Sequence, residues 1–325
     1  MTQSKNADNS KTQTRTKAPN PLGILFNTLD LYVIAQFSIY TIFSLVFFND
    51  IAWSGRLIAF NLSIISIIVG IAYWNRTNHN TFLDILHNFY IVALMLLIFK
   101  QMFFYIPVIH PHDYDYLLIA WDKAIFGVNP TQWLYQFRHP LLTEILQLCY
   151  MSFFFHAIVQ GIEMYVTGRK AEVKTIARMI AFGLFVSYFL YLVMPAVGPR
   201  FTVHEYSSIN QELPGMWLTE WFRTVVDSGD NIALGELHPI AVVNRDCMPS
   251  GHTMITLMNI IIAFRFRSRL RWVFLVVGSL LIFSTVYLRY HYVVDVLAGM
   301  VCALIVLWIE PKIWRKFLAN QWASN

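Results

Sequence analysis

Long apolar stretches recur along this chain of 325 residues, and they restrict its fold more than any other feature. A transmembrane helix needs about 20 consecutive, mainly apolar residues, and runs of that kind recur between Leu25 and Trp308. The chain is 57% hydrophobic and only 13% charged, whereas soluble domains have roughly 45–50% and about 25%. This composition excludes a soluble enzyme. The sequence therefore predicts an all-α, polytopic membrane protein.

The apolar runs predict about eight spans within one membrane domain, residues 25–310. The polar, basic segment 1–24 predicts a disordered tail, and it is too long for the charged start of a cleaved signal peptide. Residues 311–325 predict a second tail. The predicted spans cover residues 26–48, 57–74, 84–108, 141–166, 176–197, 252–265, 271–288 and 291–310.

The basic residues indicate how these spans are oriented. An even number of spans places both termini on one side of the membrane, and cytoplasmic loops carry an excess of Lys and Arg. With a cytoplasmic N-terminus, cytoplasmic segments hold 16 of the 24 basic residues, many of them in the loop 265–271. We therefore expect cytoplasmic termini and extracytoplasmic segments at 109–140 and 198–250. The net charge of +5 is explained by topology, and no nucleic-acid partner is expected.

Segment 115–138 is amphipathic but too short and polar to cross a membrane, so it predicts a helix in the interface plane. Just before it, His110-Pro-His-Asp-Tyr-Asp115 contains metal-ligating residue types. Pro111 separates the histidines and no helical spacing relates them, so we interpret this stretch as a polar loop without a metal. Cys149, Cys247 and Cys302 are expected to pack as small apolar side chains.

Three polar segments stand at the predicted ends of spans, where ionisable residues are costly and usually functional. They are Met194-Pro-Ala-Val-Gly-Pro-Arg200, Cys247-Met-Pro-Ser-Gly-His-Thr253 and Tyr287-Leu-Arg-Tyr-His-Tyr-Val-Val-Asp295. By the predicted topology, all three lie at the extracytoplasmic face although nearly 100 residues separate them in sequence. We therefore expect them to form one site within residues 194–299.

His291 and Asp295 are four residues apart, so on a helix the carboxylate can hold the imidazole in one tautomer. A nucleophilic or basic histidine needs that arrangement. Arg289 adds a planar cation that matches a phosphate group. The alternative is that His291 and Asp295 only cap and pair at a helix start.

In the second segment, Ser250 is placed as the N-cap of an apolar helix. Free amide groups at such a start, including that of Gly251, bind anions, and His252 can protonate a leaving oxygen there. Arg200 follows a rigid Gly-Pro loop and is a second candidate anion ligand. Each feature taken alone also has a purely structural explanation. Together they suit metal-free phosphoryl transfer through a phosphohistidine.

Pro249-Ser-Gly-His252 and His291-x-x-x-Asp295 resemble the second and third motifs of the type-2 phosphatidic acid phosphatase superfamily. Weaker similarity through Asp122, Phe126-Gly127, Pro130 and Tyr191 to Arg200 is like the branch that includes inositol phosphorylceramide synthases. The resemblance covers roughly residues 110–310. It implies a six-helix phosphatase-type core with its site near the extracytoplasmic surface.

The resemblance also implies a role for each site residue. His291 attacks phosphorus, Asp295 orients it, and His252 is the acid for the leaving alcohol and later the base. The phosphoryl oxygens are held by Arg200, Arg289, Ser250 and the Gly251 amide. No metal and no cofactor are implied.

The chain departs from the family pattern at two cationic positions. Val193 stands where the first motif usually has lysine, and Thr285 stands where the third motif usually has arginine. Since residues 285 and 289 are one turn apart on a helix, we expect Arg289 to replace the missing cation. The departures concern the substrate and the reaction more than the existence of the site.

The leading hypothesis is an integral-membrane lipid phosphate phosphatase with membrane lipids around it. A phosphoalcohol transferase of the inositol phosphorylceramide synthase type shares the phosphohistidine and stays open, with the loop 201–248 as an acceptor site or lid. A lipid transporter or flippase, or a non-catalytic protein, is the other alternative. Substrate identity and oligomeric state do not follow from the sequence.

Overall fold

The computed structural model describes residues 26–78 and 81–315, and within those ranges helices are the only regular elements. Every predicted apolar run contains a helix there. The long helices are α2 (Thr28–Val46), α3 (Ser54–Asn78), α4 (Thr81–Met102), α8 (Pro140–Met151), α9 (Phe153–Val166), α10 (Lys170–Val193), α15 (Gly251–Arg265), α16 (Arg271–Tyr287) and α17 (Val293–Ile313). The prediction of an all-α membrane bundle is confirmed.

Fewer of these helices than predicted are long and apolar enough to cross a membrane by themselves. Among the described residues, four qualify: α2, α3 over Ser54–Trp74, α10 and α17. The pair α8 and α9 forms a fifth candidate, bent by 52° at Ser152. Helices α15 and α16 have 15 and 17 residues, short of the roughly 20 that a span needs.

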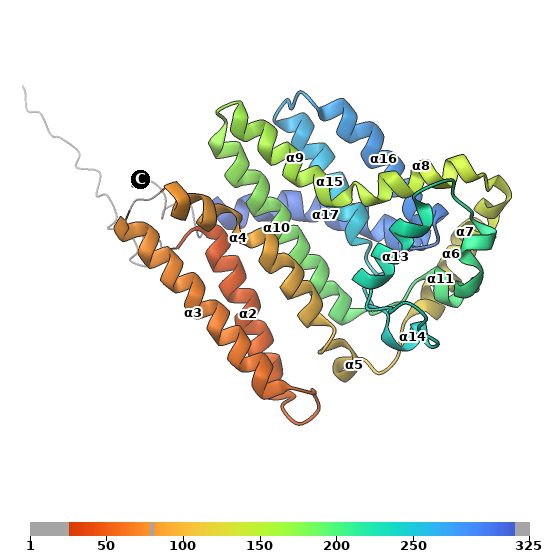
Figure 1. Cartoon of the computed structure of the whole chain (residues 1–325), viewed down its shortest axis with the longest axis horizontal. Coiled ribbons are helices and arrows are strands. Elements are labelled where there is room, and N and C mark those ends of the chain that lie inside the picture. The colour runs from red at the N-terminus through yellow and green to blue at the C-terminus, as the bar shows by residue number, and fades with distance from the viewer. Residues whose placement is uncertain (1–25, 79–80, 316–325) are drawn as a thin grey trace, which may run out of the picture.

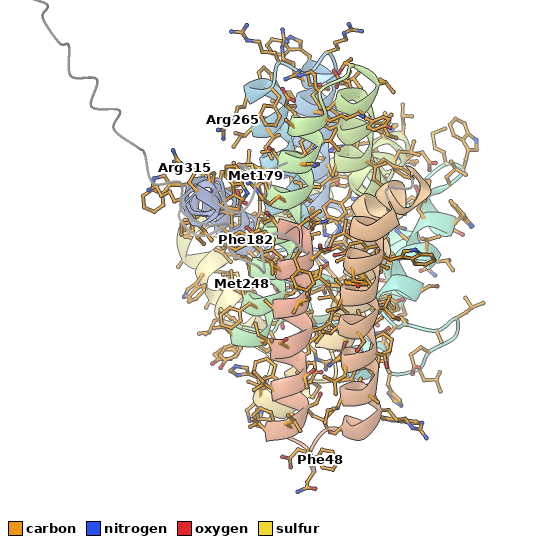
Figure 2. All side chains as sticks on the ribbon, turned by 90° about the vertical axis from the view of Figure 1, so that its left-hand side faces the viewer. Phe48, Met179, Phe182, Met248, Arg265 and Arg315 are labelled. Atoms are coloured by element: carbon orange, nitrogen blue, oxygen red, sulfur yellow. The ribbon has the colours of Figure 1, made fainter. Side chains whose placement is uncertain are left out.

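Helices α2 and α3 pack side by side as a hairpin (Figure 1). They lie on the side of the molecule opposite the short helices α11 (Pro199–Thr202), α13 (Thr219–Gly229) and α14 (Pro239–Val242) (Figure 1). Helix α2 begins at a capping box, in which the Asn27 side chain accepts from the Asp30 amide at 2.8 Å. Phe48, just beyond α2, and Arg265, at the end of α15, lie toward opposite ends of the molecule (Figure 2).

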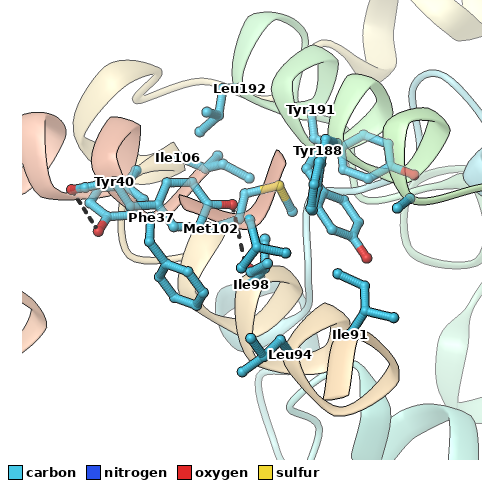
Figure 3. Packing of buried hydrophobic residues seen from close by; sticks show 14 of the residues in the cluster. Phe37, Tyr40, Ile91, Leu94, Ile98, Met102, Ile106, Tyr188, Tyr191 and Leu192 are labelled. Carbon is cyan, nitrogen blue, oxygen red and sulfur yellow. Dashed lines mark hydrogen bonds between the residues drawn. The ribbon is translucent and has the colours of Figure 1, made fainter. Parts of the chain in front are cut away.

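The hairpin joins the rest of the bundle through a buried apolar cluster from α2, α4 and α10. Phe37 and Tyr40 meet Ile98 and Met102 there, and Tyr191 of α10 lies on the far side (Figure 3). Helix α10 also contacts α9, α15 and α17. It therefore connects the hairpin to the helices that carry the polar segments.

The predicted amphipathic segment forms α6 (Asp115–Phe126), α7 (Pro130–Leu134) and a short 3-10 turn at Tyr135–Phe137. Helix α6 ends at Gly127, whose φ of 71° is the left-handed conformation that favours glycine. One face of α6 buries Asp115, Leu118 and Asp122 against the bundle. The opposite face exposes Tyr116, Trp121 and Ile125.

The chain between α10 and α15 forms only short helices: α11 (Pro199–Thr202), a 3-10 turn at Tyr206–Ser208, α12 (Ile209–Glu212), α13 (Thr219–Gly229) and α14 (Pro239–Val242). Glu144 of α8 fixes the start of α13, because its carboxylate accepts from the Met216 and Leu218 amides at 2.9 and 2.8 Å. This packing holds the segment between α10 and α15 near the N-terminal ends of α15 and α17.

Candidate active site

The three polar segments, far apart in sequence, meet at one cavity. Its walls come from the end of α8, the loop around α11, the residues before α15 and the turn between α16 and α17. The cavity is lined by Tyr150, Val197, Arg200, Asp230, Val243, Asn244, Asp246, Cys247, His252, Tyr290 and His291.

His291 and Asp295 make the predicted contact, but they make it across the start of a helix. Helix α17 begins only at Val293, and His291 Nδ1 lies 3.1 Å from Asp295 Oδ1. The other carboxylate oxygen, Oδ2, accepts from the Tyr292 amide at 2.9 Å. The carboxylate is thus fixed on two sides, and because Nδ1 faces it, Nε2 is the nitrogen that can react.

Both side chains of this pair are buried: His291 is 5% exposed and Asp295 is 0% exposed. Burial is the largest single influence and lowers the pKa of His291, but the Asp295 and Asp246 carboxylates and the Cys247 backbone carbonyl together raise it by more, so the net pKa lies above the usual value.

His252 approaches from the second residue of α15 and is held among aromatic rings. Its ring stacks on Tyr150 at 4.6 Å between centroids, and it lies 4.4 Å from the ring of Phe153. The ring centroids of His252 and His291 are 5.7 Å apart. Two imidazoles therefore line the cavity as neighbours in an edge-to-face arrangement, and their spacing suits an acid or base and a nucleophile.

The start of α15 is a capped helix N-terminus that borders the cavity. The Ser250 side chain caps the helix by accepting from the Thr253 amide at 3.2 Å, as predicted. Among the described residues, no hydrogen bond engages the amides of Gly251 and His252, so they can donate to a bound anion. A Cβ at position 251 would lie 2.3 Å from the Tyr191 hydroxyl, which explains the glycine.

Arg200 lines the same cavity and is only 4% exposed. Its Nη1 donates to Asp227 at 2.8 Å, and its Nη2 pairs with Asp230. Both carboxylates come from the C-terminal end of α13 and the residue after it. The guanidinium that was predicted to bind phosphate therefore has two internal anions as partners.

Comparison with protein families supplies the deciding observation: residues 117–309 match the family model described as the PAP2 superfamily. The chain belongs to this superfamily. The match spans more than half of the chain and includes all three polar segments. Comparisons with curated proteins and with solved structures gave no match.

Membership in the PAP2 superfamily supports a phosphatase or phosphotransferase that acts on lipid phosphates. The resemblance noted in the motifs is thus confirmed for the superfamily. The inositol phosphorylceramide synthase branch stays a prediction.

In this PAP2 superfamily member, Arg289 does not lie where the helical spacing placed it. Helix α16 ends at Tyr287, and Arg289 follows with a left-handed φ of 67°. Residues 285 and 289 therefore do not share a helix face. The Arg289 side chain pairs with Glu212 and lies over the Tyr135 ring, and it is not among the residues that line the cavity.

Cys247 is not a purely apolar packing residue, contrary to our prediction. Its thiol donates to Asp295 Oδ2 at 2.9 Å, and its backbone carbonyl lies 3.2 Å from His291 Nδ1. The sequence signal for this contact was the position of Cys247 at the start of the second polar segment, two residues before Pro249.

Two cavity carboxylates, Asp230 and Asp246, were also not predicted. Burial and the nearby charge of Asp230 raise the pKa of Asp246 to about 7. The pKa of Asp230 is raised by burial as well, although Arg200 opposes that shift. The loop 201–248 is rich in acidic residues, but nothing in the sequence pairs these two with the histidines.

Helix α6 of this PAP2 superfamily member connects the first and third segments through two aspartates. Asp115 accepts from the amides of Val197 and Gly198 at 2.9 and 2.8 Å. Asp122, two helical turns later, accepts from the amides of Val293 and Val294 at 3.1 and 2.9 Å. The carboxylates thereby fix the loop that carries Arg200 and the start of α17, which carries Asp295.

Asp122→Ala is expected to reduce both stability and activity. It leaves one buried and one partly buried amide at the start of α17 without an acceptor, at a cost of about 1–3 kcal/mol, and it frees the turn that holds His291. Thermal unfolding in detergent and turnover of a lipid phosphate measure the two effects. Asp113→Ala, which removes a half-exposed partner of Arg245, is the control, and equal behaviour of both variants would contradict the role of Asp122.

Proposed function

We propose that this protein is a metal-independent lipid phosphate phosphatase that forms a phosphohistidine at the extracytoplasmic face. The observation that carries the proposal is the pair of neighbouring imidazoles in the cavity, one of them next to a buried carboxylate 3.1 Å from its Nδ1. Arg200 and the start of α15 border the same cavity. Together they supply a nucleophile, an acid and base, and donors for phosphoryl oxygens.

In the first step, His291 Nε2 attacks phosphorus and the bond from phosphorus to the lipid oxygen breaks. His252 gives its proton to that oxygen, so the lipid leaves as an alcohol. Asp295 stabilises the positive charge that develops on His291. In the second step, His252 takes a proton from water as the water oxygen bonds to phosphorus, the bond to Nε2 breaks, and inorganic phosphate leaves.

Purified protein in detergent with a chelator tests the proposal. Phosphatidic acid, a prenyl diphosphate and a mixture of ceramide with phosphatidylinositol are offered separately, and free phosphate and lipid products are followed together. Phosphate release that is lost in His291→Ala is the expected result. A new phospholipid without free phosphate would overturn hydrolysis in favour of transfer, and no reaction on any substrate would oppose an enzymatic function.

A phosphoalcohol transferase is the second candidate, and the cavity carboxylates favour it. Asp230 and Asp246 line the cavity beside His291. Carboxylates repel a dianionic phosphate monoester, but they accept hydrogen bonds from hydroxyl groups. They therefore suit an alcohol, either on the substrate headgroup or as the acceptor that replaces water.

Asp246→Asn separates the two candidates. In a transferase, the variant diverts the intermediate on His291 from an added alcohol toward water, so the ratio of transfer product to hydrolysis product falls; the hydrolysis product is the free phosphoalcohol when the histidine carries that group, and free phosphate when it carries a phosphoryl group. In a hydrolase that ratio stays unchanged. Asp113→Asn, outside the cavity, is the matched control.

Arg200→Ala is expected to lower the rate of phosphate release about 10²-fold, as removal of a single charged ligand to the transition state does. It also leaves Asp227 and Asp230 without their cation, and we expect a loss of about 2 kcal/mol in the free energy of unfolding. Arg200→Lys keeps the charge but not the two-pronged geometry, so it should restore stability better than activity. Full activity of Arg200→Ala would show that Arg200 does not bind the substrate.

A further inference from the structure

Three different metal-ligating groups converge at the base of the cavity. Cys247 Sγ lies 2.9 Å from Asp295 Oδ2 and 3.6 Å from His291 Nδ1. His291 Nδ1 lies 3.1 Å from Asp295 Oδ1. A thiol, an imidazole and a carboxylate thus present one ligand atom each, and all of these atoms lie within 4.8 Å of one another.

These separations resemble one face of a tetrahedral zinc site. With Zn–S of about 2.3 Å and Zn–N of about 2.0 Å, the sulfur and nitrogen ligands of such a site lie about 3.5 Å apart. The measured distance between Sγ and Nδ1 is 3.6 Å. The sulfur and the imidazole nitrogen approach different carboxylate oxygens, Oδ2 at 2.9 Å and Oδ1 at 3.1 Å, so the carboxylate has to shift for one of its oxygens to complete the face. Thiolate with imidazole is a ligand set that selects Zn²⁺ and similar thiophilic cations.

We propose that Cys247, His291 and Asp295 form an inhibitory site for a thiophilic divalent cation such as Zn²⁺. The inhibitory effect rests on the proposed phosphohistidine mechanism, whereas the binding does not. The thiol releases its proton when the cation binds. The cation occupies His291 Nδ1, so the neutral ring carries its proton on Nε2, the atom that attacks phosphorus. The bound cation therefore blocks the nucleophile.

The surroundings of the cluster favour entry of a cation. Cys247 and His291 line the cavity, so a cation can reach them from it. Asp230 and Asp246 line the same cavity, and Asp246, when ionised, raises the local concentration of cations. The other cysteines, Cys149 and Cys302, do not line it.

Titration of the purified full chain with Cd²⁺, after removal of bound metal by a chelator, tests the site without reference to activity. Near-ultraviolet absorption from sulfur to cadmium charge transfer should appear with one equivalent, and Zn²⁺ should displace it. The signal should be lost in Cys247→Ser and kept in the double variant Cys149→Ser/Cys302→Ser. A signal that survives in Cys247→Ser, or one that is lost in the double variant, would overturn the proposal.

His291→Gln provides a second ligand variant in case Cys247→Ser fails to fold, and its Cd²⁺ affinity should fall about tenfold or more. In the activity arm, Zn²⁺ should inhibit phosphate release by the wild type and by the Cys149→Ser/Cys302→Ser variant. A Cys247-dependent cadmium signal without inhibition of an active enzyme would overturn the inhibitory role. The same signal in a protein with no activity would support the site and oppose the proposed function.

Discussion

His291→Ala is expected to reduce phosphate release by about 10³-fold or more, because in the proposed mechanism it removes the atom that forms the covalent intermediate. The same change should abolish phosphoenzyme labelling by a radioactive lipid phosphate. The label on the wild type should be labile in acid and stable in alkali, as a phosphorus–nitrogen bond is. His238→Ala, in the exposed part of the loop before α15, is the matched control and should retain both properties.

His252→Ala separates the nucleophile from the acid and base. Without His252, a substrate whose leaving group needs no proton should still label His291, whereas release of the label to water should slow. Labelling of His291→Ala together with loss of labelling in His252→Ala would show that His252 is the nucleophile and His291 the acid and base.

Asp295→Asn is expected to lower the rate of phosphate release about 10³-fold, because the carboxylate both orients His291 and stabilises its charged form. It should also move the pH dependence. The Asp295 carboxylate raises the pKa of His291, and the nucleophile must be unprotonated, so wild-type activity is lost as the pH falls through that pKa. Without the carboxylate the pKa falls, and the acid limb of the profile for rate against pH shifts to lower pH.

The pH profile distinguishes this role from simple damage to the fold. A variant that is merely destabilised loses activity at every pH without moving the acid limb. An unchanged midpoint of the acid limb in a folded Asp295→Asn protein would therefore show that the carboxylate does not control the pKa of His291. Asp50→Asn, in the loop after α2, is a control at a distant aspartate.

The parts of this molecule that were predictable from sequence are those set by local chemistry. Apolar runs located the helices because a membrane accepts little else. Pro249-Ser-Gly-His252 predicted a capped helix start because N-capping depends on a few consecutive residues. The contact between His291 and Asp295 was also predictable, since four residues keep two side chains close even where the helix begins between them.

The rest of the site depends on contacts between distant segments or on single backbone angles. The pairing of Arg200 with Asp227 is decided by how α13 packs, and no local pattern encodes it. Arg289 departs from its expected face because one positive φ turns the chain after α16. The roles of Asp115 and Asp122 could not be predicted, because the amides that donate to them belong to segments far away in the sequence.

The Arg200 guanidinium with its tethered carboxylates has a consequence for product release. Groups tethered within a short segment compete at an effective concentration that reaches the millimolar range, so free phosphate has to displace Asp227 and Asp230 to stay on Arg200. A lipid substrate brings the additional binding energy of its acyl chains, which the inorganic product lacks. If Arg200 binds phosphate as proposed, Asp227 and Asp230 compete with the released phosphate for the guanidinium and weaken product inhibition.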